Sequence, residues 1–182
     1  MGTLILSLIV GTGALLAPAQ RVNEDAKVLK VFSDRVAAYA DLRAREEGNL
    51  PKLDPGSSPE QIAAHQKQLA DRIRAARRDA RRGDIFDADV ALRIRRFLAA
   101  DFRGKEGRRL IKAIFEDMPP RVFLAANDPY PGSGPLSNVP PRILQALPPL
   151  PEDLEYRFMG RHLILRDSQA NIIVDFIFRI VP

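Results

Sequence analysis

The chain contains no cysteine and no tryptophan among its 182 residues, and it has two histidines. Without cysteine there can be no disulfide, no thiolate metal ligand and no cysteine nucleophile. His65 and His162 lie far apart in the sequence, without the short spacing of a zinc motif, so we expect no metal site and no cofactor. The sequence also lacks G-x-G-x-x-G, a P-loop and a G-x-S-x-G elbow, which disfavours an enzyme.

The chain has little uninterrupted apolar sequence. Its longest apolar run, Leu4–Leu16, has 13 residues, fewer than the roughly 20 that a membrane-spanning helix needs. Ala17-Pro18-Ala19 follows as an A-x-A cleavage pattern, so the sequence predicts a signal peptide over residues 1–19 and export to the periplasm or the cell exterior. Because no Lys or Arg precedes the run, two alternatives stay open. The segment is kept as an anchor, or it is a buried helix of a cytosolic protein.

The charge balance is basic. The net charge is +5 and the pI about 9.9, which favours anionic partners without selecting one. The chain is 46% hydrophobic and 28% charged, enough for a folded core. We therefore expect a single domain over residues 20–182.

Helices are predicted over residues 20–118. Apolar residues at spacings of three and four indicate a first helix. The second has a capping box, in which Ser58 and Gln61 flank Pro59 at the first helical position, and Gly83 is its expected stop. The predicted helices are Asn23–Glu47, Pro59–Arg82, a third that begins after its cap Asp87, and a fourth within residues 105–118.

Proline dominates residues 119–151, which hold ten of the fifteen prolines. The segment is too apolar for a solvated tail, and it predicts an ordered, largely extended strap lying across the helices. A short helical turn is expected at Pro141–Ala146. A structureless linker is the alternative.

Residues 152–180 predict three antiparallel strands. The strands Leu154–Met159, His162–Asp167 and Asn171–Phe178 are joined by turns at Gly160-Arg161 and at residues 167–170. The third strand alternates, which predicts one wholly apolar face made of Ile172, Val174, Phe176 and Phe178 and an opposite face made of Ile173, Asp175, Ile177 and Arg179. The fold class expected is α+β: a body of about four helices, the proline-rich strap and a C-terminal three-stranded antiparallel β-meander.

Two groups of side chains are candidate sites. An anion-binding patch is predicted at the end of the second helix, where three of the arginines have the spacing of one helix face. Its residues are Arg74, Arg77, Arg78, Arg81 and Arg82. Interleaved aspartates make an ordinary charged surface the alternative. Aromatic residues are scarce near these arginines in the sequence, so nucleic acid is not the expected partner.

The second candidate is a polar cluster of Arg161, His162 and Asp175 beside the first turn of the meander. It forms a site if these side chains face a cleft, and it is part of the sheet scaffold otherwise. The acidic run Asp84, Asp87 and Asp89 lacks the EF-hand pattern and is explained by helix capping.

Three stretches carry a resemblance: "LPPLPEDLEYRFMGRHLILRDSQANIIVDFI", "DPGSSPEQIAAHQKQLADRIRAARRDARRGDIF" and "VPPRILQALPPLP". The first resembles a C-terminal block in an uncharacterised family of exported bacterial proteins, and the other two are similar to earlier blocks of that family. The resemblance implies export and a shared fold, and no reaction.

The sequence therefore favours a non-catalytic exported protein of the cell envelope that binds a partner. One alternative is a module that binds an acidic lipid or polysaccharide through the arginine-rich helices. The other is an enzyme of unrecognised type, whose carboxylates assemble from distant positions.

Overall fold

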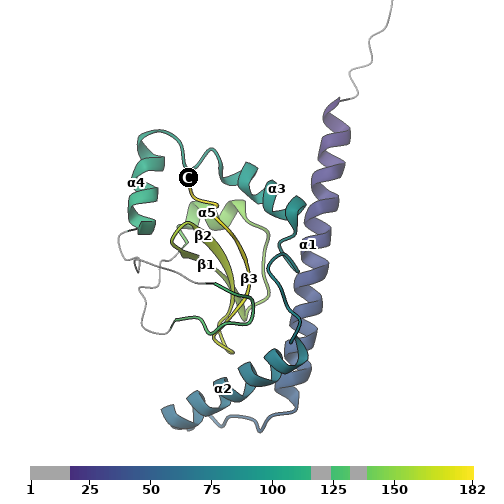
Figure 1. Cartoon of the computed structure of the whole chain (residues 1–182), viewed down its shortest axis with the longest axis vertical. Helices are drawn as coiled ribbons and strands as arrows, with labels where there is room; N and C mark the ends of the chain where they lie inside the picture. Colours follow the sequence, from purple (N-terminus) through teal and green to yellow (C-terminus); the bar gives the residue numbers. More distant parts are fainter. Residues whose placement is uncertain (1–16, 116–123, 132–138) are drawn as a thin grey trace, which may run out of the picture.

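The computed structural model describes residues 17–115, 124–131 and 139–182, and it describes side chains from Glu24 onward. It confirms the α+β fold (Figure 1). The elements in chain order are α1 (Ala17–Gly48), α2 (Pro59–Ala76), α3 (Ala88–Leu98), α4 (Gly104–Phe115), α5 (Pro141–Ala146), β1 (Leu154–Met159), β2 (His162–Asp167) and β3 (Ile172–Ile177). Most of the predicted leader, and residues 116–123 and 132–138 of the predicted fourth helix and strap, lie outside these ranges.

The long helix α1 runs along one side of the molecule and contacts both α2 and α3 (Figure 1). It begins at Ala17, earlier than the predicted start at Asn23. The two predicted caps further along are confirmed. Ser58 and Gln61 form the reciprocal hydrogen bonds of a capping box, and Asp87 accepts the N–H of Val90 at 2.9 Å. In the part of the chain that is described, no helix is long and apolar enough to cross a bilayer.

The main core lies between the helices and one face of the sheet. The helices contribute residues at spacings of three and four, so one stripe of each is fully or almost fully buried. From α1, α2 and α3 these are Phe32, Val36, Tyr39, Leu69, Ile73, Val90, Ile94 and Leu98. The stripe of α1 continues to Arg43, a charged residue that is only 6% exposed.

The meander has the predicted order β1-β2-β3, and all pairs are antiparallel. Met159 pairs with His162 across the two-residue turn, where Gly160 has a φ of 62°. Such a positive φ favours glycine, which has no Cβ. In the second turn the carboxylate of Asp167 accepts the N–H of Gln169 at 3.0 Å and that of Ala170 at 2.8 Å.

The predicted alternation along β3 is confirmed from Ile172 to Val174 and is wrong after that, because the strand contains a bulge. Leu165 pairs with Asp175 while the next residue, Arg166, pairs with Ile173, so Val174 is an extra residue. The extra residue places each side chain after it on the face of the sheet opposite to the one predicted. Ile172, Val174 and Ile177 therefore pack in the main core, and both faces of β3 are buried. The other face carries a second cluster of Tyr130, Met159, Ile164, Ile173 and Phe176.

The bulge turns Asp175 toward the main core, where it is fully buried. Its carboxylate accepts backbone N–H groups of the loop between α2 and α3: Gly83 at 2.9 Å, Ile85 at 2.8 Å and Phe86 at 2.7 Å. It also accepts the N–H of Phe176 at 2.7 Å. Convergent backbone N–H groups stabilise a buried carboxylate without a cation. Asp175 thus attaches this loop to the sheet.

A second buried carboxylate attaches α1 to the sheet. Asp167 is 0% exposed, accepts the hydroxyl of Tyr39 at 2.8 Å and lies 3.2 Å from Nε of Arg43. The same guanidinium contacts Asp153 at 2.9 Å and Glu47 at 3.0 Å. The buried charges of this network are therefore compensated within the fold.

The strap is ordered where it is described, and the helical turn at Pro141–Ala146 is confirmed as α5. Residues 124–131 pair with the outer edge of β3, whereas the sequence predicted a strap across the helices. Asn127 donates to the carbonyl of Ile173 at 2.8 Å, and the N–H of Ile173 donates to Asp128 at 2.9 Å. This pairing gives hydrogen-bond partners to backbone groups at the open edge of β3.

Removing the Asp175 carboxylate should destabilise the fold strongly. Asp175→Ala leaves the loop N–H groups buried without an acceptor, and we expect a loss of about 3–5 kcal/mol of unfolding free energy. Asp175→Asn, which keeps one acceptor oxygen, should cost roughly 2 kcal/mol. Urea denaturation measures both. Asp79→Ala is the control, since that side chain is 88% exposed, and its effect should stay within about 0.5 kcal/mol. An Asp175→Ala variant as stable as this control would contradict the assignment.

The three tyrosines of the chain should resist ionisation in the native state. Burial raises the pKa of Tyr39, Tyr130 and Tyr156 above the ordinary 10.0, and for Tyr39 the neighbouring Asp167 raises it further. The contribution of these tyrosines to the free energy of unfolding is therefore fully present below pH 10 and is lost as the pH rises beyond it, because the unfolded chain loses protons that the native chain keeps. Ultraviolet absorbance should show tyrosinate appearing only as the protein unfolds. Three tyrosines that titrate near pH 10 in the native protein would contradict this.

Candidate functional site

The predicted basic face of the second helix does not form, because α2 ends at Ala76 and not near Arg82. Asn127 of the strap contacts the end of the helix. Its side chain donates to the carbonyl of Arg77 at 2.6 Å, and its own carbonyl accepts Nε of Arg74 at 2.9 Å. The later arginines follow the helix in a turn, so the predicted shared face of Arg74, Arg78 and Arg81 is wrong.

Two of the five predicted anion-binding arginines make contacts within the fold. Arg74 donates to the strap and lies 3.0 Å from Asp71. Arg77 donates to Asn127 at 3.0 Å and to the carbonyl of Val174 at 3.3 Å, and its guanidinium lies 5.0 Å from the centre of the Tyr39 ring. Both are partly buried, and each uses two of its guanidinium nitrogens in these contacts. Arg78 is exposed and lies 3.5 Å from Asp79.

The predicted polar cluster of Arg161, His162 and Asp175 is not brought together. Asp175 faces the main core and binds backbone N–H groups. His162 pairs with Met159, which belongs to the cluster on the opposite face of the sheet. Arg161 is exposed, with its guanidinium 5.9 Å from the centre of the Phe115 ring. Of the three side chains, the carboxylate is bound by backbone N–H groups inside the fold, and the other two make their contacts elsewhere.

A different group of side chains gathers at the end of β3. Phe178 is 43% exposed, and the guanidinium groups of Arg82 and Arg179 lie 5.7 Å and 5.4 Å from the centre of its ring. The ring of His162 stacks on Phe178 with a centroid distance of 4.5 Å. Arg95 donates to the carbonyl of Phe178. We call this group the Phe178 patch; it comprises Arg81, Arg82, Arg95, His162, Phe176, Phe178 and Arg179.

The arginines of the Phe178 patch lack acidic partners. Among the described residues, no carboxylate forms an ion pair with Arg81, Arg82, Arg95 or Arg179. Elsewhere in the fold, Arg35 and Arg93 do form such pairs. The nearby Asp175 carboxylate is enclosed by N–H groups, and Asp84 accepts the N–H of Arg81 at 2.8 Å. The patch therefore presents guanidinium groups without ion-pair partners beside an exposed aromatic ring.

A hollow of about 360 Å³ opens beside the patch. Arg81 and Arg82 line one part of it, and apolar side chains line the rest, namely Ala80, Leu124, Ala125, Ala126, Phe176 and Phe178. A ligand that matches both parts is anionic at one end and apolar at the other.

His162 is a structural member of the patch. Its Nδ1 accepts the N–H of Arg179 at 3.0 Å, which uses the lone pair that a general base would need. Burial, and secondly the positive charge of Arg179, lower the pKa of His162 below the ordinary 6.5. The ring is therefore neutral near pH 7. The described residues contain no group of three His, Cys, Asp or Glu side chains that could hold a metal ion.

Sequence reasoning identified Arg81, Arg82 and His162 but assigned them to different sites. It missed the aromatic part of the patch, because Phe176 and Phe178 were placed on a buried face and lie far from Arg82 in the sequence. Exposed Phe178 next to Arg179 at the end of the last strand was the available signal.

The titration of His162 tests this arrangement. In the native protein its midpoint should lie below 6.5. Arg179→Ala should raise the midpoint but leave it below 6.5, since burial is the larger cause. Proton–carbon NMR spectra recorded across pH measure both, with Arg45→Ala as the control at an exposed site elsewhere. A midpoint that Arg179→Ala leaves unchanged would show that the two side chains are not adjacent.

Comparison with known proteins gives no family for this chain. No protein-family model, no curated protein and no solved structure matches it. The resemblance to exported bacterial proteins therefore stays a prediction, and the site must be interpreted from its own chemistry.

Proposed function

We propose that this protein is a non-catalytic, exported binding protein and that its Phe178 patch binds acidic lipid. The observation that carries the proposal is the exposed Phe178 ring with the guanidinium groups of Arg82 and Arg179 against it. Arginine donors suit lipid phosphates, and an exposed aromatic side chain suits the boundary between head groups and acyl chains. Export is part of the proposal and rests on the apolar run Leu4–Leu16 and the A-x-A pattern after it.

The lining of the hollow favours a lipid over a polysaccharide. An acidic polysaccharide matches the guanidinium groups of Arg81 and Arg82, but it has no acyl chain for Leu124, Phe176 and Phe178. An acidic lipid matches both the guanidinium groups and the apolar side chains. Single-stranded nucleic acid is disfavoured because the ring of Phe178 already contacts His162 and two guanidinium groups, which a stacked base would have to displace.

We propose that the protein is not catalytic because its buried carboxylates and the histidine of the patch are engaged in hydrogen bonds within the fold. The buried carboxylates of Asp167 and Asp175 accept hydrogen bonds from Tyr39 and from backbone N–H groups. Both are 0% exposed, so neither can reach a substrate. His162, the histidine of the patch, uses its Nδ1 within the fold.

Binding to vesicles tests the proposal. The full chain should bind phosphatidylglycerol vesicles more tightly than phosphatidylcholine vesicles, and the affinity should fall steeply with salt. The double variant Arg82→Ala, Arg179→Ala should bind roughly 10- to 30-fold more weakly, at about 1 kcal/mol for each charge. Co-sedimentation measures the affinities. The matched control is Arg45→Ala, Arg108→Ala, which removes the same charge from two exposed sites outside the patch.

Three outcomes decide between the candidates. Equal losses in the two double variants would mean that net charge, and not the Phe178 patch, drives binding. Phe178→Ala leaves the charge unchanged and should still weaken vesicle binding. Binding of a uronic-acid polysaccharide that needs Arg82 and Arg179, with no binding to vesicles, would replace the lipid by a polysaccharide.

A further inference from the structure

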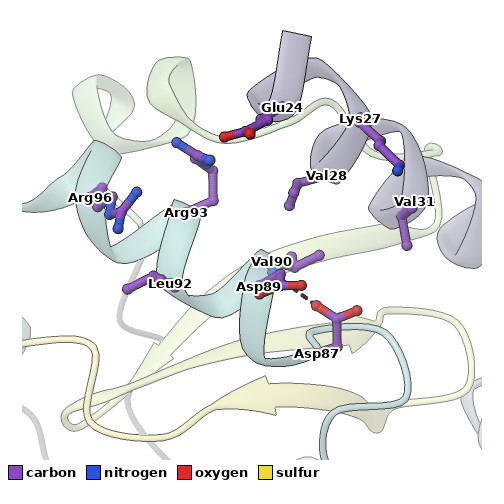
Figure 2. A pocket seen from close by; sticks show the side chains of 10 residues that line it. All are labelled: Glu24, Lys27, Val28, Val31, Asp87, Asp89, Val90, Leu92, Arg93 and Arg96. Carbon is purple, nitrogen blue, oxygen red and sulfur yellow. Dashed lines mark hydrogen bonds between the residues drawn. The ribbon is translucent and has the colours of Figure 1, made fainter. Parts of the chain in front are cut away.

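A groove of about 370 Å³ runs between α1 and α3, on a part of the molecule distinct from the Phe178 patch (Figure 2). Val28 and Val31 of α1 and Val90 and Leu92 of α3 supply its apolar side chains. Val90 is fully buried, but Val31 is 36% exposed and Leu92 is 48% exposed. Two helices thus leave part of their apolar surface without a covering element among the described residues.

Charged side chains of both signs surround this apolar surface. Glu24 and Lys27 project from α1, and Asp89 and Arg96 project from α3 (Figure 2). Within the ranges that the structure describes, none of these four forms an ion pair. Their neighbours do pair between the same elements, Arg93 with Asp25 and Arg35 with Asp87. The local ion pairs that join α1 to the α3 region are therefore already made, and four further charges remain available.

These four charges sum to zero, with one acid and one base on each helix. This pattern is self-complementary: two identical surfaces related by a twofold axis can place the acids of one copy against the bases of the other. We propose that a second copy of this chain covers the groove and that the α1–α3 pairs of the two copies pack as a four-helix interface. Val31 and Leu92 would be buried at its centre, and the four charges would form its rim. This inference does not depend on the function proposed for the Phe178 patch.

Charge exchange tests the proposal. An acidic variant, Lys27→Glu with Arg96→Glu, and a basic variant, Glu24→Lys with Asp89→Lys, each leave one sign of charge around the groove. Each alone should self-associate at least tenfold more weakly than the original chain, because like charges meet across the axis. An equimolar mixture of the two should associate again. Sedimentation velocity over a range of concentrations measures this, with Lys52→Glu, Arg108→Glu as a control that reverses two exposed charges elsewhere.

Two further results complete the test. Leu92→Asp should also weaken self-association, since it places a charge at the centre of the interface, and circular dichroism should show that each variant stays folded. The proposal is overturned by a full chain that remains monomeric at all concentrations, which would assign the groove to an unlike partner. It is equally overturned by charge variants that associate like the original chain, or by a mixture that does not associate.

Discussion

The hydrogen bonds between the Asp175 carboxylate and the N–H groups of Gly83, Ile85 and Phe86 fix how the helices meet the sheet. The β3 bulge turns this side chain into the core, and the loop wraps around it. Arg82 immediately precedes the bound loop and reaches Phe178. Asp87, the cap of α3, immediately follows it. The Phe178 patch and the α1–α3 groove therefore lie at opposite ends of one anchored segment, and both depend on it.

The two buried carboxylates are both used to hold the fold together. A buried carboxylate is costly unless hydrogen bonds or a cation compensate it. Asp175 is compensated by backbone N–H groups, and Asp167 by Tyr39, Arg43 and two N–H groups of its own turn. Each carboxylate joins elements far apart in the sequence, so these residues specify the packing of helices on the sheet. In the described part of the chain, the exposed arginines, Phe178 and the rim of the groove remain accessible to other molecules.

The fold could be predicted where the signals are local. The Ser58 capping box, the Asp87 cap, the Gly160 turn and the helical turn at Pro141–Ala146 each depend on a few adjacent residues, and all are observed. The bulge at Val174 could not be predicted, because it depends on the loop that Asp175 binds. The early end of α2 depends likewise on Asn127, a residue of the strap. Since the site is built from these long-range contacts, only Arg81 and Arg82 of its arginines were predicted, and without their aromatic partners.

Amide hydrogen exchange at Gly83, Ile85 and Phe86 tests most directly whether Asp175 anchors this loop. Loop amides exposed to water exchange quickly, whereas amides donated to a buried acceptor exchange through opening of the structure. If Asp175 anchors the loop, these three amides are protected to the same degree as the amides of β3, and Asp175→Asn removes the protection first from the loop. Fast exchange of all three amides in the native protein would contradict this anchoring.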